Sequence, residues 1–249
     1  MNQEHFHDMF AMEETHFWFR ARREIIASVL DNQNLLDSKL EVLEIGSGTG
    51  GNLVYFRQFF SDICGSEISI DAINYARKKI KDIRLEQGSL PNDIPFGDKQ
   101  FDLVLLFDVL EHVEHDQEAL DAIYKRLKPG GSLIITVPAY QFLYGAYDKF
   151  LFHFRRYNYL QLSKLLKKSG FLIKFHSYFN FWLFPLVLVS RLIERVLNRT
   201  AKYAIQGKND SLLNSLFYQI MRSEKSILSK KISLPFGSSL ICIAKKNAD

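Results

Sequence analysis

The chain has 249 residues, of which 47% are hydrophobic, and this suits one large globular α/β unit. Its two cysteines, Cys64 and Cys242, lie in apolar runs and are expected to be buried free thiols, which argues against a disulfide-built secreted scaffold. The start, MNQEHFHDMF, has no basic segment followed by an apolar one. The sequence therefore indicates no secretory signal, and a cytoplasmic location is expected.

Charge is unevenly distributed along the chain. Residues 1–148 hold 14 Lys+Arg and 24 Asp+Glu, so the totals of 32 and 28 leave 18 and 4 in residues 149–249. The first part therefore carries a net charge near −10 and the second near +14. A basic part of this kind is typical of a surface for an anionic partner such as phosphorylated lipid, a membrane face or nucleic acid. Solvated helix faces rich in lysine are the alternative.

Apolar runs alternate with amphipathic segments along the chain, beginning with a helical pattern in HFWFRARREII. Ser69 and Asp116 are expected to cap helices, and Lys128-Pro129-Gly130-Gly131 is expected to form a turn. Strands alternating with helices predict a parallel sheet with right-handed crossovers. The expected strands are 41–46, 62–67, 83–87, 101–107, 132–137, 171–176 and 238–244, and the expected helices between the first five are 51–60, 69–80 and 116–127.

We expect a single domain over 1–249, divided into an N-terminal helical cover (1–38), a core (39–176), a helical apolar insertion (177–237) and the last strand (238–249). The insertion opens with YFNFWLFPLVLV, about 12 residues, whereas a bilayer span needs roughly 20. Core packing, a lid over the substrate, a dimer face and membrane contact are all open for this segment.

A cluster of glycines ends the first expected strand in VLEIGSGTGG. Glycine lets the backbone turn sharply and approach a ligand closely, and the helix that follows offers free N–H groups. The spacing Gly46-x-Gly48-x-x-Gly51 matches the dinucleotide fingerprint. Glu67, at the end of the next strand, is placed to accept hydrogen bonds from a ribose. Nicotinamide and adenosyl cofactors both need these contacts, so the loop alone does not separate them.

Three motifs in order do separate these cofactors: EVLEIGSGTGG, IPFGDKQFDLVLLFDVLEHV and LKPGGSLIITVP. Over residues 40–140 they resemble the class I S-adenosylmethionine-dependent methyltransferases, and the branch they resemble most is the type 11 methyltransferase domain. The resemblance implies S-adenosyl-L-methionine as cofactor. It also implies an α/β Rossmann-like fold: a seven-stranded sheet in a three-layer sandwich, whose antiparallel last strand lies beside strand five.

The resemblance also assigns cofactor contacts residue by residue. A loop at the end of strand one holds the amino-acid end of the cofactor, the end of strand two contacts the ribose and adenine, and the segment after strand four lies near the methyl group. A helix cap and a surface position are the alternatives for Asp108 and His112. The corresponding residues are Glu44, Gly46, Ser47, Gly48 and Gly50, then Glu67 and Ile68, then Phe107, Asp108, Val109 and His112.

One departure from the family concerns the adenine. The family usually has an acid after strand three, whereas this chain reads Gln87-Gly88-Ser89-Leu90. Ser89 accepts a hydrogen bond less strongly than a carboxylate does, so the backbones of Gly88 and Leu90 are expected to share the contact.

Methyl transfer from a sulfonium requires positioning, exclusion of water and, for an oxygen nucleophile, removal of a proton. His153 is the candidate general base because an imidazole titrates near neutral pH, and Asp148 is the candidate residue to orient it. His112, in the segment after strand four, is a further catalytic candidate. The sequence shows no cluster at metal-ligand spacing, and no metal is predicted.

The acceptor is expected to meet the segments after strand five, in which Arg155 and Arg156 suit a phosphate or carboxylate. A structural cap on a helix over 158–169, with ion pairs to the acidic half, is the alternative for His153 and the arginines. The candidate acceptor-binding residues are Tyr140, Tyr144, Arg155, Arg156 and Tyr157.

The N-terminal segment is the third candidate wall of the site. Phe17 and Trp18 are expected to close over the cofactor because an aromatic face suits a sulfonium, and packing of a helix on the sheet is the alternative. Arg20 or Arg23 is a candidate partner of the cofactor carboxylate. The HFWFR and HFRRY runs resemble a methyltransferase subgroup linked to cell-envelope glycolipid or polyprenyl chemistry.

The sequence thus predicts methyl transfer from S-adenosylmethionine, at oxygen, to a small-molecule or lipid-like acceptor, with peripheral membrane contact as an alternative location. A nicotinamide oxidoreductase is disfavoured because no catalytic YxxxK follows a later strand. A nucleic-acid methyltransferase is disfavoured because FDVL stands where [DNS]PP[YFW] would be, so nucleic acid is not the expected partner. A non-catalytic cofactor-binding protein is the remaining alternative, and nothing in the sequence indicates the oligomeric state.

Overall fold

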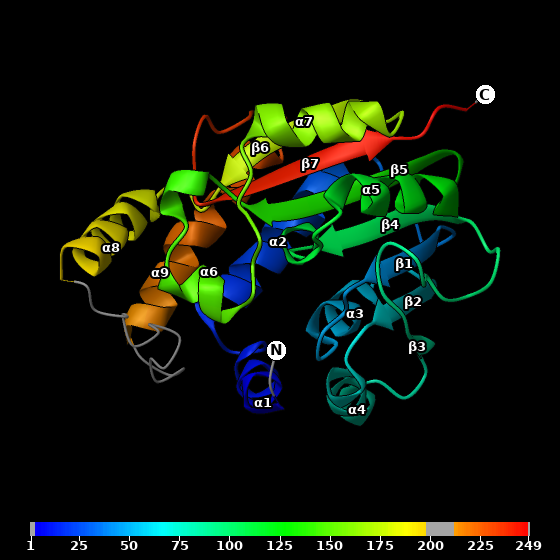
Figure 1. The fold of residues 1–249 in the computed structure, drawn as a ribbon, viewed down its shortest axis with the longest axis horizontal. Helices are drawn as coiled ribbons and strands as arrows, with labels where there is room; N and C mark the ends of the chain where they lie inside the picture. Colours follow the sequence, from blue (N-terminus) through cyan, green and yellow to red (C-terminus); the bar gives the residue numbers. More distant parts are fainter. Residues whose placement is uncertain (1–2, 198–211, 249) are drawn as a thin grey trace.

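The computed structural model describes residues 3–197 and 212–248 and contains a seven-stranded sheet of order β3-β2-β1-β4-β5-β7-β6 (Figure 1). β7 pairs antiparallel with both β5 and β6, and the other neighbouring strands are parallel. The expected position of the last strand beside strand five is confirmed. The strands are β1 Glu41–Ile45, β2 Asp62–Glu67, β3 Leu85–Gln87, β4 Phe101–Phe107, β5 Leu127–Pro138, β6 Leu172–Phe179 and β7 Ser239–Lys245.

Helices cover both faces of the sheet and complete three layers (Figure 1). On one face lie α2 Phe17–Asn32, α3 Gly51–Phe56 and α4 Ile70–Lys79, and on the other α5 Asp116–Arg126 and α7 Tyr159–Lys168. The Rossmann-like α/β fold expected from the motifs is therefore confirmed. The remaining elements are α1 Gln3–Met12, η1 Leu110–His112, η2 Gln141–Leu143, α6 Ala146–Phe150, α8 Phe184–Leu197, α9 Leu212–Ser223 and α10 Lys225–Leu228.

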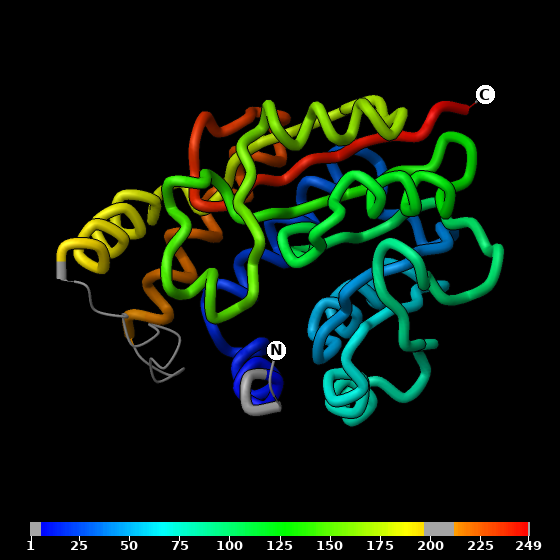
Figure 2. Tube along the Cα trace, viewed as in Figure 1, coloured from blue at the N-terminus to red at the C-terminus, as the bar shows by residue number. Residues whose placement is uncertain are grey.

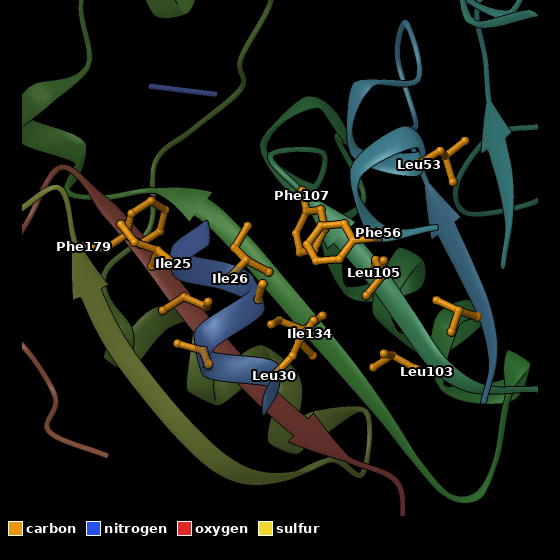
Figure 3. Close-up of a cluster of buried hydrophobic side chains, with 14 of the residues drawn as sticks. Ile25, Ile26, Leu30, Leu53, Phe56, Leu103, Leu105, Phe107, Ile134 and Phe179 are labelled. Carbon is orange, nitrogen blue, oxygen red and sulfur yellow. The ribbon is translucent and has the colours of Figure 1, made fainter. Parts of the chain in front are cut away.

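The N-terminal helix α2 supplies a central part of the core. Ile25, Ile26 and Leu30 are fully buried and face the sheet beside Ile134 of β5 and Phe179 of β6 (Figure 3). Leu30 follows Ile25 by five residues and Ile26 by four, so all three side chains lie on one stripe of the helix. Burying each such side chain contributes about 1.5–3 kcal/mol, so α2 is part of the fold as well as a cover.

The predicted helix caps have different outcomes. Ser69 caps α4, because its hydroxyl accepts a hydrogen bond from the N–H of Ala72 at 3.4 Å. The prediction for Asp116 was wrong: α5 begins at Asp116 itself, and its carboxylate binds Arg155 at 2.8 Å instead of capping the helix. Asn158 caps α7, accepting from the N–H of Gln161 at 2.9 Å.

The segment Lys128–Gly131 is part of β5 and not the expected turn. The pairing of β4 with β5 shifts register between Phe101 and Leu103, so the extra residues form an irregularity in the strand. A Cβ on Gly131 would lie 2.9 Å from the Lys128 carbonyl oxygen, so only glycine fits there.

Helices occupy most of the described part of 177–237, which β6 enters as far as Phe179. The backbone amides of Asn180, Phe181 and Trp182 donate to the buried carboxylate of Glu224, and burial raises the pKa of Glu224 to about 7. This contact fixes the start of YFNFWLF to the end of α9. Within the described residues, no helix is long and apolar enough to span a bilayer.

Candidate active site

The glycine loop connects β1 to α3 through a backbone that only glycine adopts easily. Gly46, Gly48 and Gly50 have φ angles of +73°, +54° and +86°. A Cβ on Gly50 would lie 2.7 Å from Ile80, and one on Gly46 would lie 2.3 Å from Val109. The predicted loop residues Gly46, Gly48 and Gly50 and the predicted Val109 therefore form one packed unit.

Glu67 ties this loop to the next helix. Its carboxylate accepts from the N–H of Gly48 at 2.8 Å and from the N–H of Ser69 at 2.9 Å. Burial raises the pKa of Glu67, and the backbone hydrogen bonds oppose that rise. Each oxygen keeps a second lone pair that suits a ribose hydroxyl. Ile68, the next residue, is 66% exposed and offers an apolar surface beside the carboxylate.

Glu44 lies beneath the loop and is fully buried. Its Oε1 accepts from the side-chain amide of Asn52 at 2.9 Å, while Oε2 has no hydrogen-bond partner among the described residues. Burial raises the pKa of Glu44 to about 8. Ser47 and Thr49 are also buried with unpartnered hydroxyls in the described structure. These unsatisfied groups under the loop fit a ligand that carries both an ammonium and hydrogen-bonding groups.

The connection between α1 and α2 covers the loop from outside. Glu13 accepts from the N–H of Gly51, the first residue of α3, at 3.1 Å, and pairs with Lys79 at 2.8 Å. A Cβ on Gly48 would lie 2.8 Å from Met9 of α1. Figure 2 follows the blue N-terminal trace to this place, beside α4. No motif marked Glu13 or Met9 in the sequence, because such contacts come from packing alone.

The segment after β3 is held by its own backbone. The N–H of Gly88 donates to the Glu67 carbonyl at 3.1 Å, and Ser89 and Asp93 exchange two backbone hydrogen bonds of 2.7 and 2.8 Å. The N–H of Gly88 is thus committed to the sheet, and Leu90 packs against the second hydrophobic cluster. The hydroxyl of Ser89 remains the predicted adenine contact.

The end of β4 carries a buried ion pair. Phe107, the last residue of β4, is buried, and Asp108 after it has a φ of +55°. Asp108 pairs with Arg22 of α2 and accepts from the Thr136 hydroxyl at 3.2 Å. The Arg22 guanidinium lies 4.5 Å from the Trp18 ring. Arg22 thus reaches the site from the N-terminal helix, a residue that the sequence analysis missed.

The two arginines that the sequence singled out on α2 lie elsewhere. Arg20 stacks over the ring of Tyr218 of α9, 4.1 Å from its centroid. Arg23 donates to the carbonyl of Gly51 at 2.9 Å, at the start of α3. Neither side chain is directed at Asp108.

Phe17 and Trp18, at the start of α2, contact different parts of the protein. The N–H of Phe17 donates to Asn214 at 2.8 Å, and its ring contacts that of Phe217, 5.4 Å between centroids. The structure thus places Phe17 against α9, which is the packing alternative, and not over the loop. Trp18 lies against Arg22 and so remains next to the site.

The three predicted catalytic residues lie together: His112 comes from η1 after β4, and Asp148 and His153 come from α6 and the loop after it. Nδ1 of His153 lies 3.0 Å from Asp148 Oδ1, and the rings of His153 and His112 are 4.5 Å apart. The cluster also contains Glu111, which the sequence analysis missed: its Oε1 lies 4.0 Å from His153 Nε2. Glu111 has no exposed surface, and neither of its oxygens has a hydrogen-bond partner in the described residues.

Asp148 is fixed by several donors. Arg156 Nε lies 2.7 Å from Oδ1, the N–H of Gly145 2.9 Å from Oδ2, and Arg191 of α8 3.7 Å away. Burial alone would raise the pKa of Asp148, but the His153 hydrogen bond and the Arg156 charge lower it to about 2. An ionised Asp148 accepts a hydrogen bond from Nδ1–H of His153, which leaves the lone pair on Nε2. Burial, with the charge of Asp108, raises the pKa of Glu111.

The predicted acceptor arginines are occupied by protein groups. Arg155 pairs with Asp116 at 2.8 Å, and Arg156 binds Asp148 and, at 3.3 Å, the carbonyl of Ala139. The hydroxyl of Tyr157 donates to Asp116 at 3.0 Å. These contacts match the structural alternative, and ion pairs to the acidic half account for both guanidinium groups.

The two remaining predicted acceptor residues lie along the same wall. Tyr144 donates its hydroxyl to the His153 carbonyl at 2.7 Å, so it supports the catalytic cluster. Tyr140 follows β5 with a φ of +60°, and its ring stacks on Tyr178 of β6 at 5.0 Å. Burial raises the pKa of Tyr140. The ring of Tyr140 is partly exposed, so Tyr140 stays a predicted acceptor contact.

The sheet order, the glycine loop and Glu67 at the end of β2 are typical of the class I S-adenosylmethionine-dependent methyltransferases. Comparison of the sequence with family models agrees: residues 16–174 match the methyltransferase-domain family. The chain belongs to this family, whose cofactor is S-adenosyl-L-methionine.

Among curated relatives, a Mycolicibacterium smegmatis protein named as a probable S-adenosylmethionine-dependent methyltransferase is 26% identical over 64% of this chain and 61% of its own. A dTDP-3-amino-3,4,6-trideoxy-alpha-D-glucopyranose N,N-dimethyltransferase of Streptomyces venezuelae is 28% identical over 48% and 53%. The chain thus spans between half and two thirds of these relatives.

A solved structure extends the comparison to the whole fold. The Haemonchus contortus phosphoethanolamine N-methyltransferase 2, in complex with S-adenosylhomocysteine, has a TM-score of 0.63 and 18% identity over 99% of this chain and 58% of its own. At this identity the likeness concerns the fold.

Proposed function

We propose that this protein transfers a methyl group from S-adenosylmethionine to an oxygen atom of a small-molecule or lipid-like acceptor. The observation that carries the proposal is the Asp148–His153–Glu111 cluster, which lies one turn from Asp108 at the carboxyl edge of β4. S-adenosylmethionine supplies an electrophilic methyl group on a sulfonium. The chain's own residues must bind it, exclude water and act on the acceptor's proton.

Binding is assigned to the loop and its supports. Glu67, held by two backbone N–H groups, suits the ribose hydroxyls, and Ile68 suits the adenine face. The buried Glu44 favours an ammonium close to the loop, because its Oε2 has no partner among the described residues. Arg22 and Asp108 neutralise each other and close the floor of the site.

We assign removal of the acceptor's proton to the cluster around His153. An oxygen nucleophile must lose a proton to attack, whereas a neutral amine attacks through a lone pair that it already has. A buried carboxylate and an imidazole held by Asp148 are therefore better matched to oxygen than to nitrogen. The acceptor oxygen gives up its proton and bonds to the methyl carbon, while the sulfur–carbon bond breaks and leaves its electron pair on sulfur.

Helix α8 supports a lipid-like acceptor delivered from a membrane surface. Its polar side holds the acceptor wall: Arg191 contacts Asp148, and Glu194 accepts from the N–H of Ala146 at 2.6 Å. The other side is apolar and uncovered in the described structure, and α8 projects from one end of the molecule (Figure 1). An exposed apolar helix face beside basic residues is typical of an interfacial segment. Its exposed apolar side chains are Leu186, Val189, Leu192, Ile193 and Val196, and Trp182 just before the helix is also exposed.

The test is methyl transfer from S-adenosylmethionine labelled on the methyl group into fractionated cell extract. We expect label in the lipid or small-molecule fraction, lost about 10²–10⁴-fold with His153→Ala and kept with the matched control His115→Ala, an exposed histidine. Label that is removed by nuclease would show a nucleic-acid methyltransferase. Cofactor binding without label in any fraction would favour the non-catalytic alternative.

A further inference from the structure

Two histidines and a glutamate converge on one point beside the predicted catalytic residues. One ligand atom each from Glu111, His112 and His153 lies within 4.8 Å of the other two. Glu111 and His112 come from η1 after β4, and His153 from the loop after α6. The N–H of Phe154 donates to the Glu111 carbonyl at 2.8 Å, which fixes the two segments to each other.

The buried carboxylate of Glu111 lacks the partners that its burial demands. Neither oxygen has a hydrogen-bond partner among the described residues, and the side chain has no exposed surface. His153 Nε2 lies 4.0 Å from Oε1, which is too far for a hydrogen bond. A carboxylate in this position is strongly disfavoured unless a cation or donors enter the cluster.

His153 is already oriented as a metal ligand would be. Its Nδ1 faces Asp148 Oδ1 at 3.0 Å, so Nε2 carries the lone pair and faces Glu111. Metal-binding histidines almost always donate their other ring N–H to a carboxylate or carbonyl in this way. Asp148 is in turn fixed by Arg156 and by the N–H of Gly145, so this second layer is complete.

We propose that Glu111, His112 and His153 bind a divalent transition-metal ion. Two imidazoles and one carboxylate are a ligand set of the kind found at catalytic zinc sites, which keep one position open. Ligand atoms around such an ion lie about 3.4 Å apart, closer than the 4.0 Å between Glu111 and His153 and than the 4.8 Å within which all three ligand atoms lie, so the side chains must rotate to close on the ion. Glu111 is buried and both histidines are partly exposed, which leaves a path for the ion and for a fourth ligand.

This inference rests on the proposed function and specifies how the cluster treats the acceptor. With the acceptor hydroxyl in the open position, the ion makes its oxygen a stronger acid, as bound ions do for water. The proton passes to solvent water, and the oxygen that remains is the nucleophile of the methyl transfer. His153 then acts as a metal ligand and not as the general base that the sequence predicts.

The experiment titrates chelator-treated, full-length protein with Co²⁺, followed by calorimetry, visible absorption and thermal unfolding. We expect one ion per chain, d–d absorption bands of a low-coordinate site and a rise in Tm of about 5 °C or more at an ion concentration 100 times the Kd. His153→Ala, His112→Ala and Glu111→Gln are expected to lose binding at least tenfold. The matched controls His115→Ala and Glu114→Gln, both exposed, are expected to keep it.

Misfolding is separated from ligand loss by Glu111→Gln, which keeps the size of the side chain and is expected to keep or raise the Tm of the metal-free protein. The proposal would be overturned if the wild type did not bind Co²⁺, or if none of the three ligand variants bound Co²⁺ more weakly than the wild type. S-adenosylmethionine affinity is measured on the same metal-free samples. If the wild type binds S-adenosylmethionine but not Co²⁺, only the metal-site proposal is wrong. If the wild type does not bind S-adenosylmethionine, the proposed function is wrong.

Discussion

Glu44 has no exposed surface and one oxygen without a partner in the described structure, directly under the glycine loop. Burial raises its pKa from 4.5 to about 8, so the folded protein holds the proton over a range in which the unfolded chain has lost it. The stability that this proton contributes is fully present below pH 4.5 and is lost as the pH rises towards 8.

The first prediction isolates this residue with Glu44→Gln, which imitates the protonated form. Relative to this variant, the wild type without ligand should lose roughly 3 kcal/mol of unfolding free energy between pH 5 and pH 8, measured by chemical denaturation. A difference between the two proteins that stays constant over this range would show that Glu44 titrates normally.

At the scale of elements, the N-terminal segment is both scaffold and cover. α2 fills the core with Ile25, Ile26 and Leu30, whereas the turn before it places Glu13 on the N–H of Gly51 (Figure 3). A helix N-terminus attracts anions, and a carboxylate of the chain occupies this one. The cofactor has a carboxylate of its own, and we expect Glu13 to compete with it for this helix N-terminus.

The second prediction follows from this competition. Glu13→Gln should bind S-adenosylmethionine about two- to fivefold more tightly, because the competing charge is removed while the side chain keeps its size. Calorimetric titration measures the change, with Glu14→Gln as the control, since Glu14 also contacts Lys79 but is largely exposed. Weaker binding by Glu13→Gln would mean that Glu13 supports the bound state.

At the scale of the whole molecule, the basic second part meets the acidic first part in some places and solvent in others. Arg155 pairs with Asp116, and Arg222 with Glu24, so part of the excess charge is used internally. Within residues 3–197 and 212–248, the apolar face of α8 is exposed, and an exposed apolar patch of this kind marks an interaction surface. Charge and apolar surface together favour an anionic lipid interface.

The third prediction concerns this surface. Vesicles with anionic phospholipid should sediment the wild type, and a Leu192→Asp/Val196→Asp variant should bind at least fivefold less, because both side chains lie on the exposed face of α8. Leu160→Asp is the control, since Leu160 is 75% exposed but belongs to α7. A wild type that stays in the supernatant would end the membrane proposal.

How much the sequence could predict differs by kind of feature. The strands and the glycine loop were predicted because they depend on local patterns: β4 begins and ends where 101–107 was expected, whereas β5 begins five residues before the expected start at 132. The cluster of Glu111, His112 and His153 was not predicted, because its members are separated by about 40 residues and meet only through the path of 139–157. The sequence pointed to Arg20 and Arg23, whereas Arg22 is the arginine that reaches Asp108. Which arginine of α2 faces the site depends on the rotation of the helix, and packing against the sheet and α9 sets that rotation.

The central claim is that the loop and Glu67 bind an adenosyl cofactor. Calorimetric titration of the wild type and Glu67→Ala with S-adenosylmethionine, S-adenosylhomocysteine and NAD tests it most directly, with Glu86→Ala on exposed β3 as control. We predict binding of both adenosyl ligands, none of NAD, and at least a tenfold loss in Glu67→Ala, which removes an acceptor held by two N–H groups. Binding of NAD, or adenosyl binding that is indifferent to Glu67, would contradict the account.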